Sequence, residues 1–213
     1  KLVNSPRIHN KKQSRLDSDE MKELLTDVIT GDALDDNKKP YARRSNMRDT
    51  AIIALLGGTG IRVSELVGID LNDIDWEHNC IRIIRKGGNE DIVYFGDELH
   101  RYLEDYINYE REPGDDKEKA LFVASRKDKG RLTVRSVERI VSKYGTATIP
   151  SKHLSPHSLR RTFGTNYYEE TSDLYAVADA LGHKNIQVTK DHYADISERK
   201  KQQVKEFSDK LLK

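Results

Sequence analysis

A single pair of strand-type runs interrupts a chain whose other apolar residues recur at helical spacing. Residues 81–84 contain three isoleucines, and residues 92–95 read Ile-Val-Tyr-Phe. The segment between the runs contains Gly87 and Gly88. β-Branched and aromatic runs on either side of a glycine-bearing loop predict a β-hairpin. Any sheet built on this hairpin is expected to be small and antiparallel.

The rest of the chain is mostly helical by periodicity, because apolar residues recur at i, i+3, i+4 and i+7. Ser155-Pro156 is a strong helix start, with serine as the N-cap and proline at the first helical position. We therefore predict a mainly α fold with a small antiparallel β-sheet (α+β). The helices are expected over residues 18–30, 46–56, 62–67, 97–110, 133–144, 155–170, 174–181 and 197–212.

Three segments are predicted to lie outside helices. Residues 31–44 are charged and contain Pro40, which indicates a loop. The three glycines within residues 57–60 are expected to end the preceding helix. Residues 121–123 are predicted to form a short strand.

Composition excludes several classes of protein. The chain has 213 residues, of which 34% are charged, and no segment approaches the roughly 18 apolar residues that a membrane span needs. No apolar run follows a basic start, so no secretory signal is visible. Cys80 is the one cysteine, which excludes an internal disulfide and favours a reducing cytosol. The chain begins at Lys1, which indicates a fragment or a processed chain.

Charges are segregated along the chain although the net charge is only +1. Residues 17–37 carry eight acids and one lysine, and residues 97–118 carry nine acids and three bases. Residues 123–162 carry ten bases and two acids. A basic segment of this kind indicates a face that binds a polyanion. The alternative is a solvated helix face whose charge is balanced by neighbouring acids.

The helix that begins at Ser155-Pro156 carries His157 and Arg160. They are three residues apart and are therefore neighbours on one stripe of that helix. Unpaired backbone N–H groups and the helix dipole favour an anion at this end of a helix. The pair predicts a phosphate seat, with an ordinary surface pair as the alternative.

A second arginine opens a helix directly after the glycine-rich break. Arg62 precedes Glu65 by three residues, so the carboxylate can hold the guanidinium in place. A planar guanidinium binds two phosphate oxygens at once, which suits a phosphodiester ligand. The alternative is an ion pair that only stabilises the fold.

Three further residues can carry chemistry. Lys86 stands at the glycine turn of the hairpin and can reach into a groove, unless it only improves solubility. His183 follows the expected helix end at Gly182, and Tyr193 comes ten residues later. The Tyr193 hydroxyl could act as a nucleophile if its neighbours favour the phenolate. Packing is the ordinary role of any one of the ten tyrosines.

These pieces, in this order, resemble the catalytic domain of the tyrosine recombinase family of phage and transposon integrases. The family pattern has Thr-Gly-x-Arg-x-x-Glu-Leu, a hairpin Lys-Gly, a His-x-Leu-Arg box, a Leu-Gly-His box and a tyrosine nine or ten residues later. The resemblance runs from about Arg15 to Ile196. The matching positions are Arg62, Lys86, His157, Arg160, His183 and Tyr193.

The sequence departs from the family pattern in the hairpin and after the His-x-Leu-Arg box. The family hairpin usually reads Lys-Gly-x-Lys-x-Arg, whereas this chain has Lys86-Gly-Gly-Asn-Glu-Asp91, which implies fewer phosphate contacts from this arm. Arg161 stands where many members have histidine, and we expect no loss of chemistry from that difference.

The resemblance implies metal-independent DNA cleavage and rejoining with no cofactor. It implies that Tyr193 attacks a DNA phosphate to form a 3′-phosphotyrosine bond and release a 5′-hydroxyl. It assigns Arg62 and Arg160 to the phosphate oxygens, Lys86 to the leaving oxygen, His157 to acid–base assistance and His183 to a phosphate hydrogen bond. Glu65 would support Arg62. The candidates for other DNA contacts are Arg131, Arg135, Arg139 and Arg161.

The resemblance also implies a domain order and partners. Residues 1–16 would be a linker from a missing N-terminal DNA-binding domain, 17–196 the catalytic domain and 197–213 a helical tail that docks on a neighbouring protomer or in cis. The expected partner is a double-stranded recombination site, with a monomer in free solution and a homotetramer on DNA. We expect a cytoplasmic bacterial protein that acts at the nucleoid, without membrane contact.

Three alternatives remain open. The chain could be a recombinase-like module that binds DNA without cutting it, or a type IB topoisomerase-like strand transferase. A metal-dependent nuclease is disfavoured because Pro156 separates His153 from His157 and no carboxylate–cysteine cluster accompanies them.

Overall fold

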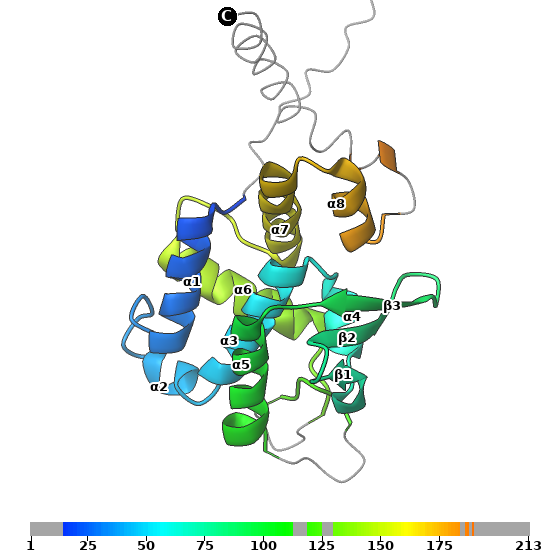
Figure 1. The fold of residues 1–213 in the computed structure, drawn as a ribbon. Helices are drawn as coiled ribbons and strands as arrows, with labels where there is room; N and C mark the ends of the chain where they lie inside the picture. The colour runs from blue at the N-terminus through cyan, green and yellow to red at the C-terminus, as the bar shows by residue number, and fades with distance from the viewer. Residues whose placement is uncertain (1–14, 113–118, 125–129, 184–185, 188, 190–213) are drawn as a thin grey trace, which may run out of the picture.

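The computed structural model describes residues 15–112, 119–124, 130–183, 186–187 and 189, and Figure 1 shows their arrangement. Helices surround a central helix, and a three-stranded sheet lies to one side. This confirms the predicted mainly α fold with a small antiparallel sheet. The helices are α1 Ser18–Thr30, α2 Lys39–Ala42, α3 Asn46–Thr59, α4 Val63–Gly68, α5 Asp97–Asp105, α6 Val134–Thr148, α7 Pro156–Thr171 and α8 Leu174–Ala180.

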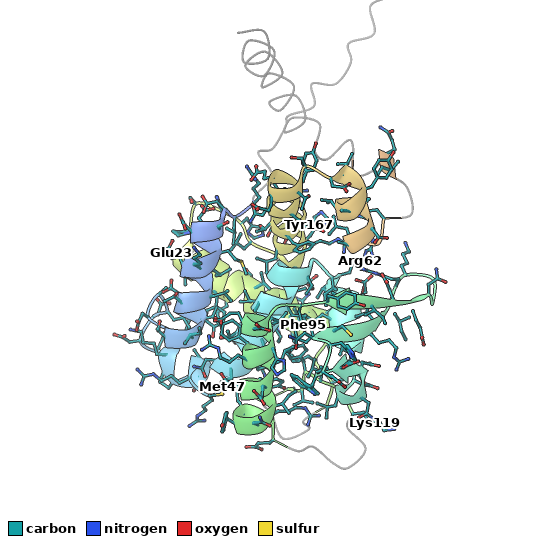
Figure 2. All side chains as sticks on the ribbon, in the orientation of Figure 1. Glu23, Met47, Arg62, Phe95, Lys119 and Tyr167 are labelled. Atoms are coloured by element: carbon teal, nitrogen blue, oxygen red, sulfur yellow. The ribbon has the colours of Figure 1, made fainter. Side chains whose placement is uncertain are left out.

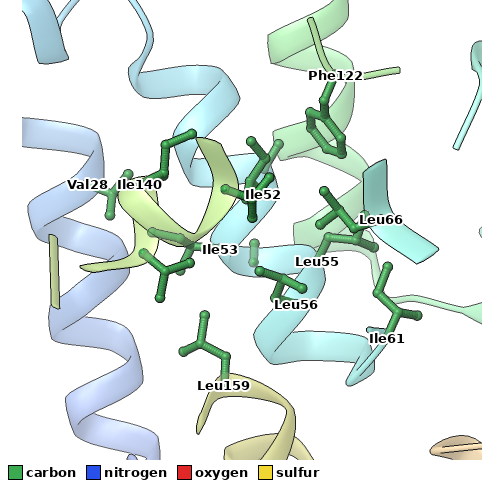
Figure 3. Packing of buried hydrophobic residues seen from close by; sticks show 14 of the residues in the cluster. Val28, Ile52, Ile53, Leu55, Leu56, Ile61, Leu66, Phe122, Ile140 and Leu159 are labelled. Carbon is green, nitrogen blue, oxygen red and sulfur yellow. The ribbon is translucent and has the colours of Figure 1, made fainter. Parts of the chain in front are cut away.

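The central helix is α3, which packs against α1, α5, α6 and α7. Its residues 48–56 are all buried, and those from Ala51 to Leu56 are all apolar. A helix that is apolar on all sides is stable only when other elements cover it completely. Figure 3 shows Ile52, Ile53 and Leu56 of α3 among side chains from the surrounding elements. The core therefore lies around α3, and both ends of this helix reach the surface regions described below.

The predicted hairpin is present and gains a third strand. β2 (Cys80–Ile84) pairs with β3 (Glu90–Tyr94), and the short β1 (Ile74–Asp75) pairs with β2, all antiparallel. Ile81, Ile83 and Val93 face the core. The alternation of strand side chains turns Ile84 and Ile92 outward.

Two helix boundaries were predicted wrongly around proline and glycine. Residues 31–44 are not all loop, because α2 begins at Lys39 with Pro40 in its first turn, where a missing N–H is tolerated. α3 does not end at Gly57 but continues to Thr59. A Cβ on Gly57 would lie 2.4 Å from Cε of Met21, so this glycine lets α1 approach α3. Gly60 alone ends the helix, with φ of +66°.

Three other predictions need smaller corrections. Residues 121–123 form no strand, since Asp70–Ala120 and Val123–Arg131 are isolated bridges. The helix expected over 97–110 changes after α5 into a π-helical stretch, Tyr106–Glu110. α6 extends to Thr148 rather than ending near residue 144.

The ends of the chain bear on the predicted division into linker, catalytic domain and tail. Arg15 and Leu16 lie in the predicted linker and contact α7: the Leu16 N–H donates to Oγ1 of Thr162 at 2.9 Å, and Arg15 pairs with Glu169 at 3.0 Å. The tail 197–213 lies outside the described residues. Over the part of the chain that the structure describes, no helix has the length and apolar character needed to cross a bilayer.

Candidate active site

A groove of about 780 Å³ brings together residues that are far apart in the sequence. Arg62, Lys86 and His183 all line it, together with Arg85 and Asp91. These residues come from the start of α4, the hairpin turn and the turn after α8. Figure 2 marks Arg62, below α8 and beside the sheet. Three of the six predicted catalytic positions therefore share one surface hollow.

Arg62 is placed by the end of α3 and the start of α4. The left-handed Gly60 ends α3, and Arg62 becomes the N-cap of α4. Glu65 accepts from the Arg62 N–H at 2.7 Å and from its Nη1 at 2.8 Å, so the expected ion pair is present. The Arg62 side chain is 33% exposed, whereas the Glu65 side chain is 2% exposed. The buried carboxylate therefore holds a guanidinium that still reaches the groove.

Arg160 lies behind this groove rather than on its wall. Ser155 caps α7 as predicted, and its Oγ accepts from the Ser158 N–H at 3.2 Å. Arg160 is only 6% exposed and donates to the carbonyl oxygens of Gly60 and Leu181, each at 2.5 Å. Those carbonyls lie two residues before Arg62 and two before His183. Arg160 therefore joins the two turns that present these side chains.

His157 occupies a different environment from Arg160 on the same helix. It stands in the first turn of α7 and is exposed, while Arg160, one turn later, is buried. Neither residue belongs to the described lining of the groove. The phosphate seat expected from the pair at the helix start is thus divided between a surface imidazole and a buried guanidinium.

His183 is held by the turn that ends α8. Gly182 has φ of +59°, and the His183 N–H donates to the Ala178 carbonyl at 2.9 Å. The imidazole Nδ1 shares a hydrogen bond of 2.9 Å with Oγ1 of the fully buried Thr189. This bond fixes the plane of the ring at the edge of the groove. Tyr193, the predicted nucleophile, lies outside the described residues.

Arg85 is a residue of this site that the sequence analysis did not single out. It lines the groove and is 8% exposed. The signal was present in the strand alternation, because position 85 continues the inward-facing series of Ile81 and Ile83. A charged residue at an inward-facing position requires buried partners, which sequence spacing does not reveal.

The basic segment 123–162 does not form one open cationic face. Arg131 pairs with Asp70 and donates to the Val67 and Ile69 carbonyls. Lys143 binds Asp49, and Lys152 binds Glu20. Arg135 and Arg139 are exposed on α6, and Arg161 is half-buried on α7. Arg131, Lys143 and Lys152 therefore bind other parts of the fold instead of facing solvent together.

Another charged hollow, of about 560 Å³, lies at the N-terminal end of α3. Figure 2 shows Met47, on its wall, well away from Arg62. Glu110 accepts there from the N–H groups of Met47 and Arg48, at 2.8 and 3.3 Å, and burial raises the pKa of this carboxyl. Glu110 thus caps α3. None of the predicted catalytic residues that the structure describes lines this hollow, so the first groove is the candidate active site.

We expect Glu65→Gln to lower the free energy of unfolding by about 3 kcal/mol, because it removes a buried carboxylate that pairs with Arg62 and Arg85. Urea unfolding measures this difference. The matched control is Glu90→Gln, which breaks an exposed pair with Arg82 and should leave the unfolding midpoint almost unchanged. Equal midpoints for the two variants would contradict a structural role for Glu65.

The chain is similar to known proteins in sequence and in fold. The profile of the phage integrase family matches residues 14–200. A tyrosine recombinase XerC from Corynebacterium glutamicum is 37% identical over 189 residues, which cover 84% of this chain and 60% of the relative. A tyrosine recombinase XerC from Vibrio cholerae is 35% identical, covering 89% of this chain and 56% of the relative. The chain thus spans less than two thirds of the length of these relatives.

Solved structures show the same fold. The crystal structure of XerA recombinase has a TM-score of 0.69 and 27% identity, and the match covers 84% of this chain and 59% of that one. A post-cleavage complex of the XerH site-specific recombinase with palindromic difH substrate has a TM-score of 0.72 at 22% identity, covering 94% and 55%. The second likeness bears on the fold alone.

Proposed function

Because the chain belongs to the phage integrase family, we propose that it is the catalytic domain of a site-specific DNA recombinase. The reaction is metal-independent breaking and rejoining of DNA through a 3′-phosphotyrosine intermediate. The observation that carries the proposal is the groove that gathers Arg62, Lys86 and His183. Arg160 joins them from behind the groove, because it donates to the carbonyls of the turns that precede Arg62 and His183.

The groove suits a phosphodiester for electrostatic reasons. Arg62 and Lys86 bring two cations to one hollow, and Arg160 brings a third close behind. Three carboxylates line the same hollow: Glu90 and Asp91 are paired with Arg82 and Arg85, and Asp179 lies near the end of α8. In-line attack on a phosphate gathers negative charge on its non-bridging oxygens, and donors fixed in advance stabilise that charge. Arg62, Arg160 and His183 take this role in the proposal. Glu65 and the two carbonyls hold the guanidiniums before DNA arrives.

The proposed reaction is balanced without an external energy source. The Tyr193 oxygen attacks phosphorus, the bond to the 5′-oxygen breaks, and a phosphotyrosine replaces the original phosphodiester. Lys86 gives a proton to the leaving 5′-oxygen, and His157 receives the phenol proton. Rejoining is the reverse reaction. One phosphoester is exchanged for another, so no nucleotide cofactor enters.

The short stretch of chain between Thr189 and Tyr193 supports Tyr193 as the nucleophile. Tyr193 follows Thr189 by four residues, and Thr189 is bonded to His183 at the edge of the groove. Four residues span at most about 14 Å even when fully extended. The neighbourhood of the groove is therefore within the reach of the chain from Thr189 to Tyr193.

The proposal is tested with a nicked duplex whose sequence beside the nick is randomised. Cleavage next to the nick releases a short strand with a 5′-hydroxyl, so religation fails and the protein stays bound covalently. We expect a covalent protein–DNA band that forms equally well with a metal chelator present. No covalent band, or one that the chelator abolishes, would overturn the proposal and favour a binding module or a metal-dependent nuclease.

We further propose that the partner is a double-stranded recombination site in the cytoplasm, on which four copies of a chain that is monomeric in solution assemble. The tail 197–213 carries an apolar stripe of Val204, Phe207 and Leu211 at helical spacing. In the proposal this stripe docks on a neighbouring protomer. The same proposal places the domain boundaries at 16/17 and 196/197. It also includes DNA contacts by Arg135 and Arg139.

Deleting residues 198–213 is expected to weaken assembly on DNA. Burial of even one of the stripe's side chains contributes about 1.5 kcal/mol, which corresponds to a loss of about tenfold or more in assembly. Gel retardation of the captured DNA site measures assembly, and the covalent band measures cleavage. Docking in cis would instead lower thermal stability without changing assembly. Unchanged assembly and cleavage would contradict a role for the tail.

A further inference from the structure

Arg85 is a buried cation in the wall of the candidate active site. Its side chain is 9% exposed, and it stands where β2 leads into the hairpin turn. A guanidinium taken out of water needs charged or hydrogen-bonded partners on each side. Its backbone closes the turn, with the Arg85 N–H donating to the Asn89 carbonyl at 2.8 Å and the Gly88 N–H donating to the Arg85 carbonyl at 3.0 Å.

The guanidinium binds three different segments of the chain. Nε donates to Oδ2 of Asp91 on β3 at 2.8 Å, and Nη1 donates to Oε2 of Glu65 on α4 at 3.1 Å. Nη2 donates to the carbonyl of Ala180, the last residue of α8, at 3.1 Å. Lys86 stands in the hairpin turn before β3, Arg62 at the start of α4 and His183 in the turn after α8, so each of the three segments adjoins one of these residues.

The contact with α4 runs through the same buried carboxylate that holds Arg62. Oε2 of Glu65 accepts both from the Arg62 N–H and from Nη1 of Arg85, while Oε1 accepts from Nη1 of Arg62. One carboxylate therefore lies between two guanidiniums. A displacement of Arg85 changes the surroundings of Glu65 and, through it, the direction of Arg62.

The turn before His183 packs directly on Arg85. A Cβ built on Gly182 would lie 2.7 Å from Nε and 2.8 Å from Cζ of Arg85. The backbone at Gly182 thus rests on the guanidinium, with φ of +59°. Together with the bond to the Ala180 carbonyl, this close packing fixes the position of the turn before His183 relative to Arg85.

We infer that Arg85 is a positioning residue that aligns Arg62, Lys86 and His183 around one phosphate. The inference rests on the proposed function. Asp91 is one of the partners that hold Arg85 in place. This accounts for a carboxylate in the hairpin where the family pattern has arginine, because an arginine there would put a second cation against Arg85. Lysine cannot replace Arg85, because a single ammonium cannot span Asp91, Glu65 and the Ala180 carbonyl in one plane.

The test compares Arg85→Lys with the unaltered chain in single-turnover cleavage of the nicked DNA sequence that the unaltered chain captures. Misplacement of reacting groups by about 1 Å lowers rates by about 100-fold, and we expect a loss of this size with DNA affinity nearly unchanged. The matched control is Arg82→Lys, on the same strand, because Arg82 pairs with Asp73 and Glu90 on the exposed face. This control should cleave at the normal rate.

A second substrate separates positioning from a loss of folded protein. With sulfur in place of the bridging 5′-oxygen, the leaving group no longer needs a proton, so the placement of Lys86 stops mattering. General acid catalysis contributes about 100-fold or more, and the Arg85→Lys defect should therefore shrink at least about tenfold on this substrate. A smaller folded fraction would slow both substrates equally.

The outcomes are distinguishable. No adduct from the unaltered chain overturns the proposed function and this inference with it. An adduct from the unaltered chain, with Arg85→Lys cleaving at the same rate or equally slowed on both substrates, overturns the inference alone. If Arg85→Lys does not fold, Asp91→Asn decides in the same assay. This variant keeps Arg85 and its other two partners, and it has one acceptor oxygen where the half-exposed Asp91 uses two, for the Ile92 N–H and for Nε of Arg85. Normal cleavage by Asp91→Asn would then contradict the inference.

Discussion

Replacing Tyr193 by phenylalanine is expected to abolish the covalent protein–DNA adduct completely. The change removes one oxygen atom, the one that forms the bond to phosphorus in the proposed reaction, and no other group can supply that bond. The variant should still bind the nicked duplex with unchanged affinity, because the cations of the groove stay in place. Denaturing electrophoresis of labelled DNA measures the adduct, and fluorescence anisotropy measures binding.

Tyr175→Phe is the matched control for this prediction. Tyr175 is 71% exposed on α8, so its hydroxyl can be removed without disturbing the core. It should form the adduct at the normal rate. Full adduct formation by Tyr193→Phe would contradict the proposed nucleophile and leave another hydroxyl to be found among the remaining tyrosines. Binding without cleavage by both the control and the unaltered chain would instead favour a non-catalytic DNA-binding module.

Replacing Arg160 by lysine is expected to lower the rate of cleavage by about 1,000-fold, the size of effect found when a preorganised donor to a reacting oxyanion is lost. The guanidinium spans the carbonyls of Gly60 and Leu181 as a rigid fork. A single ammonium cannot hold both, so the turns before Arg62 and His183 lose their common anchor. Single-turnover cleavage of the nicked duplex measures the rate.

The same substitution should also weaken the fold. A buried carbonyl that loses its donor costs about 1–3 kcal/mol, so urea unfolding of Arg160→Lys should shift by an amount in this range. Arg101→Lys is the control, since Arg101 pairs with Glu98 on the surface, lies over the Tyr102 ring and is on α5, away from the groove. Normal cleavage by Arg160→Lys would remove Arg160 from the catalytic set. Slow cleavage by the control would show that the assay responds to any exchange of arginine for lysine, and Arg160 would then have no specific role.

The fold was largely predictable because its elements are local. Three features depend on residues close together in the sequence: the hairpin, the capped start of α7 at Ser155 and the turn at Gly182 that follows α8. The end of α3 was not predictable, since Gly57 and Gly60 are the same residue type in different surroundings. Gly57 lies against Met21 of α1, whereas Gly60 takes the left-handed conformation that ends the helix.

Only those residues of the candidate site that stand in short sequence motifs could be predicted. Arg62, Lys86 and His183 stand in short motifs and meet in the groove. The burial of Arg160 was not predicted, because helix position alone indicates an exposed first-turn pair with His157. Arg85 was missed for a related reason: Asp91 is near it in the sequence, but Glu65 and Ala180 come from other elements, and only the fold brings them to it.

The central claim is that these separated side chains act on one DNA phosphate, which Tyr193 attacks. The most direct measurement is mass spectrometry of the peptide that remains attached to DNA after the trapped adduct is digested with protease and nuclease. The account predicts a nucleotide bound through its 3′-phosphate to the oxygen of Tyr193. A nucleotide on any other residue, or a linkage through a 5′-phosphate, would contradict it.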